Sequence, residues 1–440
     1  MTERTLAILA LAMGLAIRIA ALPLPGAGDV GEWKIWTHAS VVDGVTTLYG
    51  RGPAEDHIVR FNQSESTVNY PPLALYELDA TGRLYGFATS NRFADSAAFT
   101  VTLKTLPVVF EAGLILLLGI ALRAVHGGAV AWWAVAAYWL NPAAIADASI
   151  GGYLDPLYVL PAVAALVAAA SGRSTLAGGL VAASALTKPL GVLVGPAVLI
   201  VVWHAGEPRA ALRRLRNAVV GGSVVCALLV APFVAAGAWR NMLHQLPMTL
   251  TADDSVSMSG YNAWWLAGHV VSAAYASMRG VSLGSALRAP ADYVLFDRAA
   301  AHGLDRSLII ALGTAMVTAA IAWSAWIGRR ARDLALASAL GAFAVIAYAT
   351  LGTQIHENHA FGAVPLLVVA AAGRRRFAPI LIAVSALVTL NLVFYGLSDD
   401  GRFVVSRAWT GIDATLVVAA LDCVVLVWFG WVLRRECRSA

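Results

Sequence analysis

Residues 102–122 read TLKTLPVVFEAGLILLLGIAL, and this apolar run decides the class of fold. A helix needs roughly 17 to 25 such residues to cross a hydrocarbon core about 30 Å thick, and this run is long enough. Comparable runs recur along the whole chain of 440 residues, which is 59% hydrophobic and 13% charged. Ordinary globular domains carry about a quarter charged residues. The sequence therefore predicts an all-α, polytopic transmembrane helical bundle.

About twelve spans fit the apolar pattern, which places both chain ends on the cytoplasmic side. Arg18 and the even number of spans favour a retained first helix over a cleaved signal peptide. The predicted spans are 5–22, 102–122, 129–146, 153–170, 175–187, 190–203, 217–236, 308–327, 333–351, 360–372, 377–394 and 413–433.

Basic residues gather in the short connections that this topology places in the cytoplasm, as the positive-inside rule requires. We therefore attribute the net charge of +5 to topology and expect no nucleic-acid partner. The two long polar segments, 23–101 and 237–307, lie on the opposite face in this topology. We expect them to form the catalytic face of a single domain, 1–440. The largest basic clusters are Arg209/Arg213/Arg214/Arg216, Arg329/Arg330/Arg332, Arg374/Arg375/Arg376 and Arg434/Arg435/Arg438.

The segment 176–203 is long enough to be one helix, but it contains Lys188-Pro189. Proline removes a backbone donor and interrupts a helix. We therefore predict two half-spans, a feature that at membrane depth usually lines a cavity. A lysine at that depth is a functional candidate, although its side chain could also extend to the interface.

The first outer segment contains two features that suggest a site. Its start, 29–36, reads DVGEWKIW, and tryptophans three apart predict an amphipathic helix lying in the headgroup layer. Its later part contains Tyr70-Pro71-Pro72-Leu73, a rigid extended turn. Asp29 follows the first span directly, where partial burial would raise its pKa into the range of a general base. A solvated helix N-cap is the alternative for this residue.

The connection 354–359 reads QIHENH and joins two spans on the same outer face. Histidine can donate to a phosphate oxygen and so stabilise a leaving group. A metal site is the alternative, although no clear third ligand accompanies His356 and His359.

Several other charged residues lie in or beside the spans. Glu111 is expected to form an ion pair with Lys104 or Arg18, and Asp147 and Asp155 flank the turn at 151–153. A lipid phosphate would need one or two arginines, which the sequence does not single out. The outer-face candidates are Arg18, Arg240, Arg279, Arg288, Arg298 and Arg306.

Taken together, these motifs resemble the GT-C superfamily of polyprenyl-phosphate-sugar dependent glycosyltransferases. They are most similar to the dolichyl-phosphate-glucose and dolichyl-phosphate-mannose dependent enzymes and their bacterial relatives. The resemblance lies in motif order and topology, and the most specific match is Tyr70–Leu73. The weaker matches are Gly28-Asp29 with Trp36, Gly152–Leu157, Leu186–Pro189 and His356-Glu357. The chain departs from the family pattern at Asn69, where aspartate is frequent, and at Asn358, where a basic or aromatic residue is common.

The resemblance implies a GT-C-type bundle and inverting transfer of a hexose, with mannose favoured and glucose next. The donor would be a polyprenyl-phosphate sugar, and the acceptor a lipid-linked or cell-envelope glycan on the non-cytoplasmic face. Asp29 would be the catalytic base, and His356 and Lys188 would bind the donor phosphate. No cofactor or metal is expected, because fixed cations can stabilise the phosphate. Further candidates for the substrate groove are Glu32, Trp36, Tyr70, Asp155, Glu357 and His359.

Two other classes of function also fit this hydropathy pattern. A lipid or solute transporter or flippase would need many spans and broken helices, but no internal repeat is visible. A polyprenyl-diphosphate-dependent glycan polymerase or ligase would need more than one arginine near its carrier. The alanine- and arginine-rich composition resembles that of GC-rich bacteria, which suggests a multi-pass protein of the plasma membrane with its active site outside the cytoplasm.

Overall fold

Helices dominate the computed structural model of the protein. The only strands in the described ranges form two short antiparallel pairs, the hairpin of β1 (Ile58–Phe61) with β2 (Ser64–Thr67) and the pair of β3 (Ala408–Trp409) with β4 (Ile412–Asp413). The first hairpin was not predicted. The structure describes residues 3–52, 55–126, 128–205, 207–246, 254–291, 305–396, 408–409 and 412–439.

Six helical segments in the described part of the chain are long and apolar enough to cross a membrane. A seventh results if the pair Gly128–Trp139 and Pro142–Gly151, bent by 47°, counts as one broken span. The long elements are α4 (Ala97–His126), α10 (Ala211–Ala235), α15 (Arg306–Ile327), α16 (Leu334–Leu351), α18 (Ala378–Asn391) with its flanking turns, and α19 (Ala414–Arg438).

Shorter apolar helices occupy the remaining predicted spans. These are α1 (Glu3–Ala21), α7 (Asp155–Ala170), α8 (Ser174–Thr187), α9 (Gly195–His204) and α17 (Ala363–Gly373). The bent pair is α5 (Gly128–Trp139) followed by α6 (Pro142–Ala144) and a π-helical turn over Ile145–Gly151. The predicted all-α, polytopic bundle is confirmed, whereas the number of twelve spans stays a prediction.

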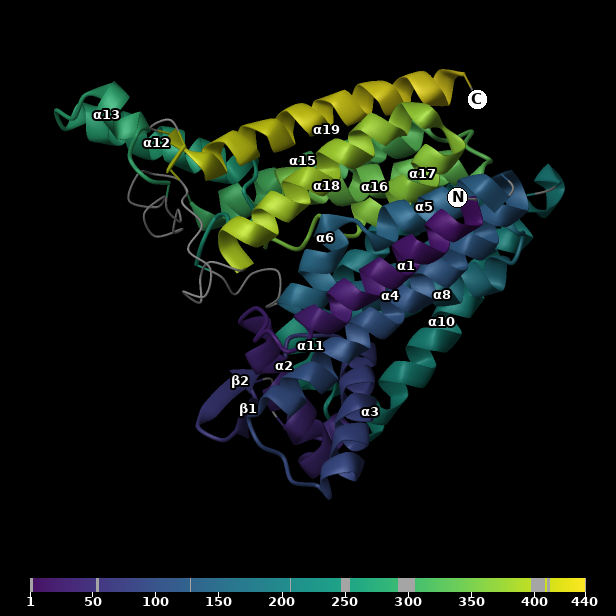
Figure 1. Cartoon of the computed structure of the whole chain (residues 1–440), viewed down its shortest axis with the longest axis vertical. Coiled ribbons are helices and arrows are strands. Elements are labelled where there is room, and N and C mark those ends of the chain that lie inside the picture. The colour runs from purple at the N-terminus through teal and green to yellow at the C-terminus, as the bar shows by residue number, and fades with distance from the viewer. Residues whose placement is uncertain are drawn as a thin grey trace.

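Figure 1 shows α1, α4, α8 and α10 on one side of the bundle and α15 to α19 on the other. The outer segment that follows α1 gathers at the lower end of this view as α2 (Asp29–Ala39), the hairpin β1–β2 and α3 (Pro72–Thr89). The short helix α11 (Trp239–Gln245) lies nearby, while α12 (Ala263–Met278) and α13 (Leu283–Leu287) project from the other side.

The outer segment has its own hydrophobic core, which corrects the prediction of a headgroup helix. Trp33 and Trp36 are both 2% exposed, and their rings pack edge to face 5.1 Å apart. Both rings also contact Tyr70, at 5.0 and 5.6 Å between centroids. The tryptophans therefore face the hairpin and the Tyr-Pro-Pro turn rather than lipid, because those segments provide an internal apolar surface for them.

The break between α8 and α9 lies where Pro189 predicts it. Helix α8 ends at Thr187, and Lys188 is extended with φ −145° and ψ 134°. A 3₁₀ turn over Pro189–Val194 then leads into α9. A single helix through this segment is therefore excluded, and Lys188 lies at the corner between the two halves.

A buried ion pair joins α1 to α4 and α5. The Arg18 guanidinium donates to both oxygens of Glu111 at 2.8 and 3.1 Å, and to the carbonyl of Trp139 at 2.7 Å. Both charged side chains are 0% exposed. Lys104 donates instead to the carbonyls of Ala21 and Leu24, at 3.0 and 2.8 Å, and so fixes the chain where it leaves α1. The predicted pair of Glu111 with Arg18 is confirmed.

Glu111→Ala should lower the free energy of unfolding in detergent by about 3–5 kcal/mol, because it leaves the Arg18 charge buried without a partner. The control is Glu65→Ala, which removes an exposed pair with Arg60 at 3.1 Å. That change should cost no more than about 1 kcal/mol. Equal losses of stability in the two variants would contradict a structural role for the buried pair.

Candidate active site

A cavity of about 330 Å³ lies where four segments of the chain meet. These segments are the start of α2, the stretch from the hairpin to the Tyr-Pro-Pro turn, the α8–α9 break and the connection between α16 and α17. It is lined by Asp29, Glu32, Trp33, Trp36, Ser66, Thr67, Asn69, Tyr70, Lys188, Pro189, Leu190, Tyr348, His356, Glu357, Asn358 and His359. Of the nine predicted site residues, only Asp155 is missing from this lining.

Asp29 is the first residue of α2 and contributes its carboxylate to the cavity. The N-cap residue is Gly28, and no side chain forms a cap hydrogen bond, so the alternative of Asp29 as the N-cap is wrong. The pKa of Asp29 is raised to about 6, chiefly by burial and also by the nearby Glu357 charge, while the charges of His356 and Lys188 limit the rise. A carboxylate with this pKa is ionised at neutral pH and can accept a proton.

Lys188 enters the cavity from the α8–α9 corner. Its Nζ donates to Asp155 Oδ1 at 2.9 Å, and its side chain is 7% exposed, so extension to the interface is wrong. The second oxygen of Asp155 accepts from the Asn358 amide at 2.8 Å. Asp155 is 0% exposed and lies behind Lys188, where it holds the ammonium in place instead of lining the groove.

The connection between α16 and α17 brings two imidazoles to the cavity. The backbone N–H of His356 donates to His359 Nδ1 at 3.3 Å, and the two rings are 5.1 Å apart. Burial lowers the pKa of His359 well below its usual value, with further lowering by Lys188 and His356. His359 is therefore neutral, and because Nδ1 accepts a hydrogen bond, its proton is on Nε2.

Glu357 lines the cavity, and both of its oxygens are occupied. Tyr153 donates its hydroxyl to Oε1, and Ser259 donates to Oε2. These contacts tie the turn before α7 and the second outer segment to the α16–α17 connection. The negative charge of Glu357 lies near Asp29 and contributes to its raised pKa.

Tyr70 and the two tryptophans form the aromatic wall of the cavity. Pro71 is extended, with φ −68° and ψ 165°, and α3 starts at Pro72, so the turn fixes the direction of Tyr70. The carbonyl of Tyr70 accepts from the Tyr49 hydroxyl at 2.5 Å. The Lys188 ammonium lies 6.0 Å from the centroid of the Tyr70 ring, at the outer limit of a cation–π contact.

Sequence reasoning missed some of the residues that shape this cavity. Ser259 carries no local signal, because its contact with Glu357 joins residues far apart in the chain. Asn358 stood out only as a departure from a family pattern, although its amide holds Asp155. Trp33 could have been found from its position beside Asp29 and Trp36.

The arginines considered for a phosphate do not line this cavity within the described ranges. Arg18 is committed to Glu111, and Arg306 pairs with Asp254 at 3.2 Å. Arg298 lies outside the described residues. Among the described residues that line the cavity, an ammonium is contributed by Lys188 and imidazoles by His356 and His359.

This arrangement places a proton acceptor and fixed donors in one cavity. An ammonium and imidazole N–H groups suit an anion, and Asp29 lies on the same cavity wall as Glu32. No group of three or more histidine, cysteine, aspartate or glutamate side chains in the described ranges is arranged to hold a metal ion. The site can thus combine general-base action with stabilisation of a departing anion.

Comparison with known proteins gives a likeness in fold. No family model and no curated protein matches the chain. Among solved structures, a match is the crystal structure of ArnT from Cupriavidus metallidurans bound to undecaprenyl phosphate, with a TM-score of 0.51 and 15% sequence identity. The chain has the fold of ArnT. The match covers 98% of this chain and 77% of that one.

At this identity the likeness establishes the fold alone. The predicted helical bundle is confirmed as a fold shared with ArnT, and with its apolar helices the chain is a multi-pass membrane protein. Roles of individual residues do not follow from the comparison.

Removing the Glu357 charge should change the titration of Asp29. In Glu357→Gln the midpoint of the Asp29 carboxyl, followed by infrared spectroscopy with ¹³C-labelled aspartate, should fall below the value of about 6, because one cause of its rise is gone. The exposed Asp43 provides the control, since Asp43→Asn should leave that midpoint unchanged. A midpoint that stays the same in Glu357→Gln would contradict the proximity of the two carboxylates.

Proposed function

We propose that the protein is an inverting glycosyltransferase of the GT-C superfamily that uses a polyprenyl-phosphate sugar. The observation that carries this proposal is the cavity in which Asp29 faces Lys188 and the two histidines. The fold shared with ArnT, whose crystal structure contains undecaprenyl phosphate, supports the same class of donor. The apolar helices of the bundle suit a donor that stays in the membrane.

In the proposed reaction an acceptor hydroxyl attacks the anomeric carbon of the sugar. Asp29 takes the hydroxyl proton as the new C–O bond forms, and the bond from the anomeric carbon to the phosphate oxygen breaks. The bonding electron pair leaves with the polyprenyl phosphate, and in-line attack inverts the anomeric configuration. A base with a pKa of about 6 is ionised at pH 7 and still accepts the proton in the transition state.

The departing phosphate gains charge and needs fixed donors. Lys188, held by Asp155 at 2.9 Å, supplies a positive charge that does not need to reorganise during the reaction. His356 donates from the opposite segment, and neutral His359 donates through Nε2. Tyr70, which is partly exposed and backed by the two buried tryptophans, offers an aromatic ring to the sugar, a common way to recognise carbohydrate C–H groups.

The donor sugar is proposed to be a hexose, in the order mannose and then glucose, and the acceptor a lipid-linked or cell-envelope glycan. The proposed location is the plasma membrane, with the active site on the periplasmic or extracellular side. Metal independence is part of the proposal, because the cationic side chains can take the role that a divalent ion has in other transferases.

One ammonium in the cavity favours a monophosphate carrier. A diphosphate carrier, as in a glycan polymerase or ligase, would present more negative charge than Lys188 can balance. Within the described ranges no arginine lines the cavity.

Asp29→Asn should abolish transfer of radiolabelled mannose from polyprenyl-phosphate mannose, with a loss of at least about 10³-fold, because the amide cannot accept the proton. Wild-type transfer should continue in the presence of EDTA. Asp43→Asn changes an exposed carboxylate of the same outer segment and should transfer normally.

Equal transfer by wild type and Asp29→Asn would remove Asp29 from the chemistry. Loss of transfer with EDTA would overturn the metal-free mechanism. If wild type transfers neither mannose nor glucose nor a pentose but moves the lipid between leaflets, the protein is a transporter and the proposed function is wrong.

A further inference from the structure

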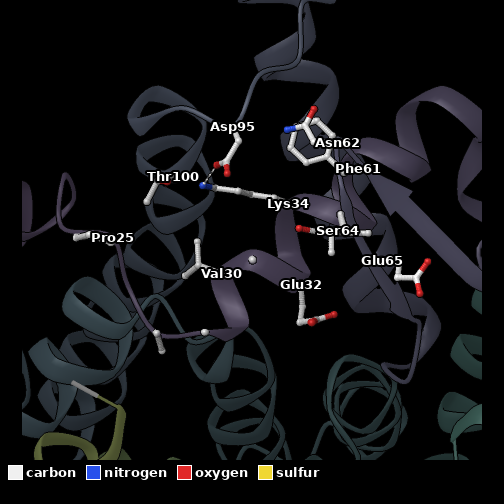
Figure 2. Close-up of a pocket in the computed structure, with 14 residues that line it drawn as sticks. Pro25, Val30, Glu32, Lys34, Phe61, Asn62, Ser64, Glu65, Asp95 and Thr100 are labelled. Carbon is white, nitrogen blue, oxygen red and sulfur yellow. Dashed lines mark hydrogen bonds and ion pairs between the residues drawn. The ribbon is translucent and has the colours of Figure 1, made fainter. Parts of the chain in front are cut away.

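A second, larger cavity lies on the other side of α2. It has a volume of about 660 Å³ and is enclosed by α2, the hairpin β1–β2 and the start of α4. Figure 2 shows Glu32, Lys34, Asn62, Ser64 and Asp95 around it. Ligand cavities in proteins commonly range from about 300 to 1,000 Å³, so the space suits a molecule of one or two sugar rings.

Glu32 connects this second cavity with the active site, because its side chain lines both. It is one helical turn after Asp29, on the face between the two spaces. Within the described part of the chain, Glu32 has no hydrogen-bond or ion-pair partner. Its carboxylate is therefore free to accept hydrogen bonds from a bound molecule, and it lines the same cavity as Asp29.

Two glycines of the α2 region leave the second cavity open. Gly28 and Gly31 both line it, and a Cβ built on either residue would meet no atom within 4 Å. Glycine inside a helix costs roughly 0.5–1 kcal/mol relative to alanine, and neither packing nor a positive φ requires glycine at position 31. The missing side chain instead gives a ligand access to the helix backbone.

The lining of the second cavity is polar and mostly acidic or neutral. Among the described residues that line it, the one cation is Lys34, which donates to Asp95 at 2.5 Å. The Glu65 carboxylate is paired with Arg60, which does not line the cavity. Asn62, Ser64 and Thr100 add neutral donors and acceptors. Because Glu32 keeps an uncompensated charge, an anionic ligand would be repelled, whereas a neutral polyol finds many hydrogen-bond partners.

We infer that this second cavity is the acceptor subsite and that it takes an uncharged, polyhydroxylated glycan end rather than a phosphorylated or acidic one. Glu32 acts as a positioning residue that accepts a hydrogen bond from the acceptor and directs its nucleophilic hydroxyl to Asp29. The assignment as an acceptor subsite rests on the proposed glycosyl transfer. The preference for a neutral glycan rests on the lining alone.

The first test fills the cavity from Gly31. Gly31→Leu should weaken binding of a neutral disaccharide, methyl mannobioside, at least about tenfold in NMR or calorimetric titrations of the detergent-solubilised protein. Gly31→Ala, which adds only one methyl group, should weaken it less. Both variants should unfold at or above the wild-type temperature, because open space surrounds the new side chain and glycine is a poor helix former.

The second test concerns charge. Wild type should bind methyl mannobioside more tightly than its 6-phosphate, and Glu32→Gln should reduce this preference roughly threefold to tenfold by removing a nearby like charge. Glu55→Gln, outside both cavities, should leave the preference unchanged. A wild-type preference for the phosphate would overturn the inference, as would an unchanged preference in Glu32→Gln.

Failure of this inference can be told apart from failure of the proposed function. If Gly31→Leu binds the disaccharide as wild type does, or if wild type does not bind it at millimolar concentration, the acceptor assignment is wrong even when transfer is observed. A different outcome is that wild type binds the disaccharide, Gly31→Leu does not bind it, and no sugar donor supports transfer. In that case the cavity is a glycan-binding site, but the proposed transferase activity is wrong.

Discussion

The ion pair between Lys188 and Asp155 is the interaction on which the site depends. A lysine buried among helices is costly unless a carboxylate and further hydrogen bonds compensate it. Asp155 does this with one oxygen and binds Asn358 with the other, so a single carboxylate joins the α8–α9 break, the start of α7 and the α16–α17 connection. These three segments come from different parts of the bundle, and their junction forms the back wall of the cavity.

The front wall comes from the outer segment, which contributes the negatively charged Asp29 in contrast to the positively charged Lys188 of the back wall. Asp29 follows α1 after a short connection, and Lys104 fixes the end of α1 by donating to two backbone carbonyls there. Its raised pKa follows from burial and from Glu357, and the nearby cations prevent a larger rise. The cavity therefore holds the proposed proton acceptor together with the proposed phosphate-binding groups, and α2 separates that cavity from the one proposed for the acceptor.

Much of this arrangement follows from the sequence because its causes are local. Apolar run length predicted the helices, Pro189 predicted the broken helix, and motif resemblance brought Asp29, Tyr70, Lys188 and His356 together. What sequence reasoning missed depends on contacts between distant segments. The tryptophans of α2 were assigned to the membrane surface because the hairpin that covers them was not predicted. Asp155 was expected in the groove, but its position behind Lys188 depends on the Asn358 amide.

The central claim is that a lipid-linked phosphate binds between Lys188 and the histidines, with Asp29 facing the anomeric carbon. The most direct measurement is a cryo-electron microscopy structure of the protein with polyprenyl phosphate in a lipid nanodisc. The account predicts phosphate density in contact with Lys188 Nζ and His356, in the cavity bounded by Tyr70. Phosphate density elsewhere, with this cavity lacking any lipid headgroup, would contradict the account.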